Sequence, residues 1–309
     1  MRAADPLSPF TDQPIRWPAE AIWQAVEPVL PGFTVEILPE IDSTNTELMR
    51  RFRGRLADSA GGRAVEPLTE PTLLVAEQQT AGRGRLGRQW QSQRAASLMF
   101  SLGMALQPKE WSGLSLVVGI SLAESLDPAG GQIGLKWPND LWLVGSHGER
   151  KLAGILVETA SWEGTRYVVI GVGINIRPLV LPEPASTATG PAPMPPGCLQ
   201  EVFPEVDAAG ALFKVVPALL QNVQAFEHFG FAPFQARFAR RDVLAGRTVQ
   251  LSGEQTGFEG TAHGVSEGGA LLVHTAAGMK VITSSEVSVR PGAYGSGSGG
   301  LGAQGGSPC

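Results

Sequence analysis

The segment GRGRLGRQW, residues 82–90, contains two kinds of residue that bind phosphate groups. Its three glycines follow the spacing G-x-G-x-x-G, which is a dinucleotide fingerprint when it joins a strand to a helix. Arginines stand between and directly after these glycines, at Arg83, Arg85 and Arg88. A glycine loop with three guanidinium groups raises the question of which anionic ligand it would bind.

The surrounding sequence argues against a dinucleotide-binding fold. That fold places the glycines directly between a strand and a helix, with an acidic residue at the end of the next strand. Here QQTA separates the predicted strand 72–77 from Gly82, and the residues after the loop alternate as in a strand. The next acidic residue, Glu110, lies in a predicted turn, so the dinucleotide interpretation fails on context.

Two interpretations of the loop remain. For a GRGR stretch alone, an ordinary surface loop is the favoured one. However, arginine offers bidentate donors to anions, and glycine lets backbone N–H groups approach an anion and lets the loop rearrange around it. The loop therefore also suits a phosphate or an acyl phosphate that forms within the site.

Two further segments place lysines in strand-like surroundings. KWPND, residues 136–140, is on its own most simply the end of a strand followed by a turn. KLAGILVE begins with Lys151, which would ordinarily be a solvated residue at the edge of a strand. Since Gly154 lets a ligand lie against the backbone, Lys151 is also placed to stabilise the charge that develops when a carboxylate attacks a phosphate.

Alternating glycines mark a fourth segment, IGVGIN. Gly171 and Gly173 leave one face of a predicted strand without side chains. An empty strand face is unfavourable unless something fills it, so this pattern favours a ligand in that space.

A large folded core is needed to hold these segments together, and the composition provides one. The chain has 309 residues, of which 43% are hydrophobic, enough for one large domain and a small second one. The net charge of −5 and the isoelectric point near 5.5 argue against a broad surface for nucleic acid or membrane. Only Cys198 and Cys309 are present, which excludes a disulfide framework or a zinc site. We expect a cytoplasmic protein, because neither a signal peptide nor a membrane helix is recognisable.

Helices and strands are predicted in the first part of the chain from its hydrophobic pattern. Helices are expected at 17–30, from Ser43 onward, and, fully buried, at 111–126. Thr44 and Glu47 fit a capping box at the second helix, and residues 53–71 read as a loop. The predicted strands cover 72–77, 95–106, 133–137, 140–144, 151–160 and 166–176.

In the remainder of the chain, the composition and the hydrophobic pattern change twice. Residues 178–200 are rich in proline and predict an extended insertion, and residues 205–229 predict a helix with a kink at Pro217. From about residue 243, short β runs separated by glycine turns indicate a small barrel.

Taken in order, the motifs resemble the biotin protein ligase family. The matching stretches are DSTN (42–45), AEQQTAGRGRLGRQW, KWPNDL, KLAGILVE and IGVGINI, and with the C-terminal β runs the likeness spans residues 40–292. The resemblance implies an α/β fold of the α+β type, in which a mixed, largely antiparallel sheet is packed with helices, as in class II synthetases. A small SH3-like β-barrel follows.

This resemblance also implies a division into domains. An N-terminal extension would cover 1–40, and a catalytic domain 41–241 would contain the Pro-rich insertion. The SH3-like domain would cover 242–292, and a disordered Gly/Ser tail would follow at 293–309.

The reaction implied by the resemblance has two steps. The carboxylate of biotin attacks the α-phosphate of ATP, with Mg²⁺, and gives biotinyl-5′-adenylate and pyrophosphate. A lysine of the biotin carboxyl carrier protein of acetyl-CoA carboxylase then attacks the mixed anhydride. The arginine loop would close over the intermediate and exclude water.

Site residues follow from the matched motifs. Lys151, Arg83 and Arg85 would be catalytic, and Asn139 and Asp140 would hold Mg²⁺. Biotin would be bound by small polar residues, the loop, a lysine and glycines: Ser43, Thr44, Gln79, Gly82, Arg83, Gly84, Arg85, Lys151, Gly171 and Gly173. The nucleotide and its phosphates would be bound by Arg83, Arg85, Lys136, Trp137, Asn139, Asp140, Lys151, Asn175 and Arg290. Asn45 and Trp90 are further candidates.

The same resemblance bears on the partners of the protein and on two alternative functions. Only about 40 residues precede DSTN, so we expect a monofunctional enzyme without a helix-turn-helix domain and without DNA binding, as a monomer or homodimer. A lipoate-protein ligase would share the catalytic core, although the biotin-type arginine loop argues against it. A non-catalytic sensor of biotin or its adenylate is the remaining alternative.

Overall fold

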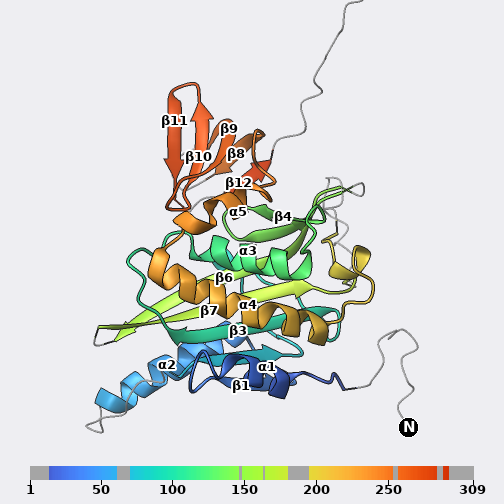
Figure 1. Cartoon of the computed structure of the whole chain (residues 1–309), viewed down its shortest axis with the longest axis vertical. Helices are drawn as coiled ribbons and strands as arrows, with labels where there is room; N and C mark the ends of the chain where they lie inside the picture. Colours follow the sequence, from blue (N-terminus) through green and yellow to red (C-terminus); the bar gives the residue numbers. More distant parts are fainter. Residues whose placement is uncertain are drawn as a thin grey trace, which may run out of the picture.

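The computed structural model describes residues 14–60, 70–145, 148–162, 164–179, 195–252, 257–283 and 288–291. Its main part is a seven-stranded sheet with the order β1-β2-β3-β7-β6-β5-β4 (Figure 1). Only β1 and β2 run parallel, and all other neighbours are antiparallel. The strands are β1 (Thr34–Leu38), β2 (Thr72–Ala76), β3 (Ser97–Ala105), β4 (Ile133–Lys136), β5 (Asp140–Leu143), β6 (Arg150–Trp162) and β7 (Thr165–Asn175). The predicted mixed, largely antiparallel sheet is confirmed.

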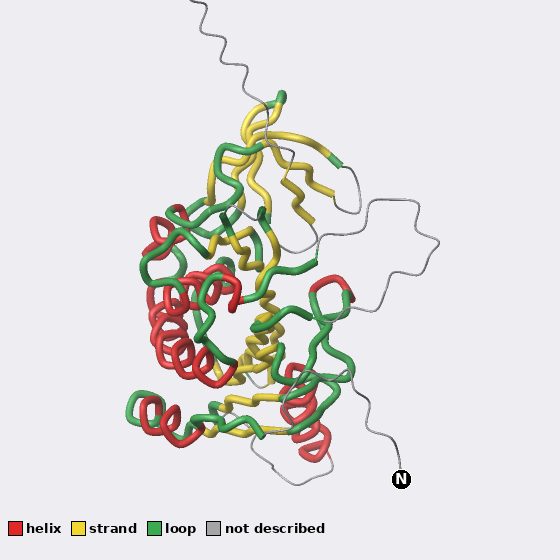
Figure 2. The backbone as a smooth tube through the Cα atoms, turned by 90° about the vertical axis from the view of Figure 1, so that its right-hand side faces the viewer, coloured by secondary structure: helices red, strands yellow, loops and turns green. Residues whose placement is uncertain are grey.

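Helices cover both faces of this sheet, as the side view of Figure 2 shows. On one face lie α1 (Ala19–Val26), α3 (Leu114–Leu126) and α4 (Ala208–Phe229), which share the main hydrophobic core with the strands. The sequence of α3 is apolar nearly all round because the helix lies between the sheet and α4. On the opposite face, α2 (Thr44–Ala60) packs through a smaller cluster around Phe52 and Tyr167, whose rings stack 4.7 Å apart.

The start of α2 differs from the predicted capping box. The helix begins one residue earlier than that motif requires, so Ser43 is the capping residue and its Oγ accepts a hydrogen bond from the backbone N–H of Thr46 at 3.4 Å. Thr44 is instead the first helical residue, and its hydroxyl contacts Gln79. The side chain of Glu47 pairs with arginines of the next turn rather than with the helix start. The assignment of Thr44 as the cap was therefore wrong.

Two predicted loops are shorter than expected. Residues 53–60 of the predicted loop 53–71 continue α2, and residues 61–69 lie outside the described part of the chain. At the end of the Pro-rich stretch, Cys198 and Leu199 are buried against the core, and the N–H of Gly197 donates to the carbonyl of Lys151. Residues 180–194 of that stretch, and the tail from residue 292, lie outside the described residues. Short helical turns are η1 (Arg85–Gly87), η2 (Leu199–Glu201) and η3 (Ala232–Phe234), the last followed by α5 (Gln235–Ala239).

The C-terminal part forms a second, antiparallel sheet with the order β11-β10-β9-β8-β12. Its strands are β8 (Thr248–Ser252), β9 (Phe258–Val265), β10 (Leu271–Thr275), β11 (Gly278–Ile282) and β12 (Ser288–Pro291). The predicted small β domain is confirmed, and among the described strands the pairing stays open rather than closing from β11 to β12. Figure 1 shows this sheet above the α3 and α5 end of the larger sheet.

Trp137 and its neighbours join the two sheets. The indole N–H of the buried Trp137 donates to the carbonyl of Gly269 at 3.0 Å, and the Ser112 hydroxyl donates to the carbonyl of Gly268 at 2.5 Å. The backbone around Arg241–Val243 also pairs with Leu135 of β4. Among the described helices, none has the length and apolar character that crossing a membrane requires.

Candidate active site

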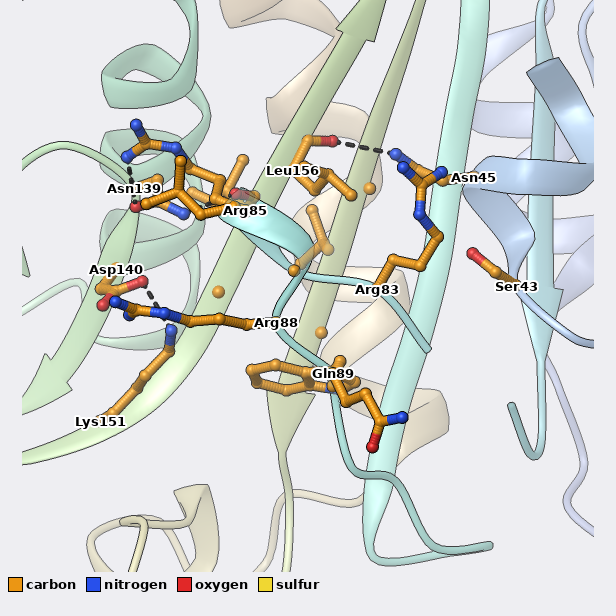
Figure 3. Close-up of a pocket in the computed structure, with 18 of the residues that line it drawn as sticks. Ser43, Asn45, Arg83, Arg85, Arg88, Gln89, Asn139, Asp140, Lys151 and Leu156 are labelled. Atoms are coloured by element: carbon orange, nitrogen blue, oxygen red, sulfur yellow. Dashed lines mark hydrogen bonds and ion pairs between the residues drawn. The ribbon is translucent and has the colours of Figure 1, made fainter. Parts of the chain in front are cut away.

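A pocket opens on the α2 side of the large sheet, and most of the predicted site residues line it (Figure 3). It is bounded by the start of α2, by the arginine loop and by strands β4 to β7. Those predicted residues that line it are Ser43, Thr44, Gln79, Arg83, Gly84, Arg85, Lys136, Asn139, Asp140, Lys151, Gly171 and Gly173. The sequence motifs therefore converge on one place, although they come from distant parts of the chain.

Glycines form the floor of the pocket because of the way the strands pair. Gly171 of β7 lies opposite Ser101 of β3 and Leu156 of β6, and Gly173 lies opposite Gly154. A Cβ atom on Gly171 would lie 2.1 Å from Oδ1 of Asn45, and one on Gly173 would lie 2.4 Å from the Trp90 indole. The sequence predicted a ligand in the space above these glycines. The structure shows that side chains of the protein also occupy it.

The neutral end of the pocket is built from the first turn of α2. The Gln79 side-chain oxygen accepts hydrogen bonds from the backbone N–H of Thr44 at 2.8 Å and from its hydroxyl at 3.1 Å. The fully buried Ser101 hydroxyl lies 2.7 Å from Oγ1 of Thr44 and 2.6 Å from Oδ1 of Asn45. This end presents hydroxyl and amide groups, which suit a neutral ligand that both donates and accepts hydrogen bonds.

The opposite end of the pocket is cationic. Lys136, Lys151 and Arg85 lie there, around Asn139 of the turn between β4 and β5 and around Asp140, the first residue of β5. Nζ of Lys151 lies 2.7 Å from Oδ1 of Asp140 and 5.7 Å from the centre of the Trp90 ring. With Arg83 and Arg88, five cationic side chains and one carboxylate line the pocket, and this balance favours a polyanion.

The arginine loop is anchored to both ends of the pocket. Arg83 pairs with Glu158 of β6 at 3.1 Å, whereas Nη1 of Arg85 donates to Oδ1 of Asn139 at 3.2 Å. Burial of the Arg85 guanidinium lowers its pKa from the ordinary value. Directly after the Arg85 anchor, Leu86 adopts a left-handed conformation with φ of 55° and is exposed. The two arginines, which were predicted to serve the phosphates together, point to different ends in this structure (Figure 3).

Four predicted residues do not line this pocket in the structure. Trp137, the first residue after β4, is buried, and its indole N–H is directed toward Gly269 in the turn between β9 and β10. Asn175 is buried and its amide donates to the carbonyl of Gly197. Gly82 lies beside the pocket under the backbone of Trp90, and Arg290 lies in β12 with its side chain outside the described part.

The two residues predicted to bind Mg²⁺ form only a partial set of metal ligands. Asn139 and Asp140 supply one amide oxygen and one carboxylate, and these accept hydrogen bonds from Arg85 and Lys151. No cluster of three or more His, Cys, Asp or Glu residues occurs in the described ranges. Because Mg²⁺ is commonly bound through one or two carboxylates together with substrate phosphates, these residues fit the ion only with a bound nucleotide.

Four residues in or directly beside the pocket were missed or given little weight. Ser101 and Glu158 were not singled out, and Asn45 and Trp90 were only further candidates. Strand alternation would have found Glu158, because it shares a face with Gly154 and Leu156 in KLAGILVE. Ser101 lies in a plain apolar run, so only its pairing opposite Gly171 reveals it.

Comparisons with known proteins agree with this geometry. A family model described as the biotin/lipoate A/B protein ligase family matches residues 41–175, and a model of the biotin protein ligase C-terminal domain matches residues 245–290. The bifunctional ligase/repressor BirA of Escherichia coli (strain K12) is 34% identical over 265 residues, covering 84% of this chain and 75% of the relative. The biotin–[acetyl-CoA-carboxylase] ligase of Paracoccus denitrificans is 30% identical over 260 residues, covering 81% and 98%.

The fold agrees with a solved structure as well. A structure of the biotin protein ligase from Aquifex aeolicus in complex with biotin and ATP matches with a TM-score of 0.64 and 30% identity. The match covers 84% of this chain and 99% of the other.

Proposed function

The chain belongs to the biotin protein ligase family, and from this premise we propose that it uses ATP to join biotin to a lysine of a carrier protein. The carrier in this proposal is the biotin carboxyl carrier protein of acetyl-CoA carboxylase, as the name of the Paracoccus denitrificans relative suggests. The proposal includes a cytoplasmic location, where both ATP and the carrier would be available. It also places the boundary between the catalytic and C-terminal domains near residues 241–242.

One observation carries the proposal: a single pocket joins a neutral, hydrogen-bonding end to a cationic end. Thr44 and Gln79 at the first end suit the ureido ring of biotin, which needs polar partners when it is buried. Lys136, Lys151 and Arg85 at the second end suit the phosphates of ATP. Such a pocket brings the biotin carboxylate to the α-phosphate and so favours a reaction between them.

In the first step of the proposed reaction, an oxygen of the biotin carboxylate attacks the α-phosphorus of ATP. A new C–O–P anhydride forms, the bond to the β-phosphate breaks and pyrophosphate leaves. Lys151 lies beside the strand floor at Gly154, where its ammonium group would neutralise the charge that builds up on the reacting oxygens. Asn139 and Asp140 would hold Mg²⁺, which supplies neutralisation of the phosphate charge when it is bound.

In the second step, the neutral amine of the acceptor lysine attacks the carbonyl carbon of the anhydride. An amide forms, AMP leaves with the electron pair of the broken C–O bond, and the amine loses its proton. The loop between the anchors at Glu158 and Asn139 would keep water from the anhydride until the acceptor arrives. Ser43 and the glycines at 82, 84, 171 and 173 complete the biotin-binding part of this proposal.

Biotin-dependent exchange of labelled pyrophosphate into ATP tests the first step directly. The purified chain is incubated with ATP, Mg²⁺ and either biotin or lipoate, without an acceptor protein. Exchange with biotin supports the proposal, and exchange with lipoate instead would replace it by a lipoate-protein ligase. No exchange with either acid, from folded protein that binds ATP, would contradict catalysis and favour a sensing role.

A further inference from the structure

Glu158 stands out because it is an acidic residue beside a pocket that is otherwise suited to anions. It follows Gly154 and Leu156 at alternating positions of β6, so all three face the pocket side of the sheet. Its side chain is only 23% exposed. A partly buried carboxylate near a negatively charged ligand is unfavourable unless fixed donors compensate it.

Two donors compensate this carboxylate, and both belong to the pocket. Arg83 contributes Nη2 at 3.1 Å from Oε1 and Nη1 at 3.4 Å from Oε2. Asn45 contributes its Nδ2 at 3.0 Å from Oε2. Glu158 therefore ties the arginine loop to the first turn of α2.

Asn45 extends this connection to the neutral end of the pocket. Its Oδ1 lies 2.6 Å from the Ser101 hydroxyl, which lies 2.7 Å from the hydroxyl of Thr44. Thr44 in turn donates to Gln79. Hydrogen-bond contacts thus run without a break from Gln79 through Thr44, Ser101, Asn45 and Glu158 to Arg83.

We propose that Glu158 is a positioning residue that holds Arg83 at the neutral end of the pocket and so clamps the loop over bound biotin. Arg83 then acts on the biotin side, and Arg85, 3.2 Å from Asn139, acts on the phosphate side. Because Thr44 and Gln79 belong to the same network, biotin bound to them stabilises the clamp, and the clamp slows the release of biotin. This inference rests on the proposed function for its ligand, but the clamp itself is a property of the protein alone.

Limited proteolysis of the ligand-free protein tests the clamp without any activity. Trypsin cuts after Arg85 and Arg88 only when the loop is released, and the rate is followed by mass spectrometry. Because half-exposed ion pairs contribute about 0.4–1 kcal/mol within their usual range, Glu158→Gln should speed these cuts about two- to fivefold. Glu36→Gln is a matched control, because it removes an ion pair with Arg51 elsewhere on the α2 face and should leave the loop rate unchanged.

A double-mutant cycle shows whether Glu158 acts through Arg83. In an Arg83→Gln background, Glu158→Gln should cause no further increase in cleavage after Arg85 and Arg88, because the contact is already lost. An equal increase in both backgrounds would overturn the proposal. So would equal loop cleavage in Glu158→Gln and the unsubstituted protein.

Dissociation of radiolabelled biotin supplies the second measurement. The half-life of the bound biotin should be about two- to fivefold shorter in Glu158→Gln, with an unchanged melting temperature and with no change in Glu36→Gln. An unchanged half-life would overturn the role in biotin retention. If the unsubstituted protein binds no biotin, the proposed function fails, while the proteolysis still decides whether the clamp exists.

Discussion

Lys151 is the residue whose surroundings say most about the chemistry of the pocket. Its ammonium group is held between the carboxylate of Asp140 and the face of the Trp90 ring. These contacts fix the charge in position before any ligand arrives, and a preorganised charge needs little rearrangement during the reaction. At 41% exposure of its side chain, Lys151 also remains accessible to a ligand in the pocket.

Replacing Lys151 by alanine should abolish most of the adenylate formation. Loss of one preorganised charge-stabilising group typically lowers kcat by about 10²- to 10³-fold, so we expect this loss in biotin-dependent pyrophosphate exchange. The melting temperature should change little, because the residue is half exposed. Lys214→Ala, on the exposed side of α4, is the control and should exchange normally. Normal exchange by Lys151→Ala would refute the assigned role.

Arg85 should matter for retention of the intermediate rather than for its formation alone. Arg85→Gly removes the contact with Asn139 and loosens the loop on the phosphate side. Adenylate that escapes reacts with any nearby amine, so labelling of bystander lysines on an added inert protein should rise several-fold. Arg85→Lys, which keeps a cation, should give an intermediate level. Bystander labelling at the level of the unsubstituted protein would count against a closing loop.

Residue types and spacing placed many of the predicted residues at this pocket, and contacts formed only in the fold explain most of the differences. The motif KWPND supplied Lys136, which lines the pocket, but Trp137 lies in the turn directly after β4 and its indole is directed toward Gly269 instead. The alternation of side chains along a strand, applied outward from Gly154, would have added Glu158. Ser101 could not be found this way, because its importance arises only when β3 pairs with β7.

Among the elements, β7 and the arginine loop depend on each other most directly. Trp90 lies at the end of the loop, and its indole rests on Gly173, where even a methyl group would lie 2.4 Å away. The backbone N–H of Trp90 also donates to the carbonyl of Gly82 at 2.9 Å, which closes the base of the loop. The glycines of β7 therefore determine how closely the loop can approach the floor of the pocket.

Gly173→Ala should displace this loop and weaken biotin binding. Forcing extra volume into a packed site typically costs about 1–3 kcal/mol, which corresponds to a rise in the biotin KM of about fivefold to 150-fold. The effect on KM for ATP should be smaller. Gly268→Ala is a suitable control, because a Cβ atom there meets nothing closer than 3.9 Å. An unchanged biotin KM would mean that the contact between Trp90 and Gly173 does not determine the position of the loop.

Prediction from sequence was strongest for elements with a regular pattern and weakest at their ends. The strands β3 and β7 and the buried helix α3 were recognised because nearly continuous apolar runs extend along them. The end of α2 was missed, because residues 53–60 are polar and glycine-containing and local sequence alone favours a loop. The position of Ser43 as the cap depends on where the chain leaves Ile41, which pairs with Gln79.

At the scale of the whole molecule, the joint between the two sheets could not be predicted, since its contacts connect residues far apart in the chain. Arg241 pairs with Asp127 at 3.2 Å, and Arg247 pairs with Glu149 at 2.6 Å. The segment between these arginines runs beside β4 and leads into the second sheet. Residues that shape the reactive pocket at β4 and β5 therefore lie close to the joint.

Asp242 makes this joint sensitive to pH. Burial raises the pKa of its carboxyl group to about 6, although the backbone N–H of Leu244 donates to it at 2.8 Å. Its Oδ2 is buried without a partner among the described residues. The folded protein therefore holds the proton more tightly than the unfolded chain, and the stability from this group is complete below pH ~4 and is lost as the pH rises through ~6.

Asp242→Asn should reveal this loss because asparagine stays uncharged at every pH. The melting temperature of the variant, relative to the unsubstituted protein, should rise between pH 4 and pH 7 as the buried carboxylate becomes charged in the unsubstituted protein alone. Differential scanning calorimetry at several pH values measures this difference, with the exposed Glu205→Gln as the control. Titration of all other groups cancels in the comparison. A difference that stays constant from pH 4 to pH 7 would show that the pKa of Asp242 is not raised in the folded protein.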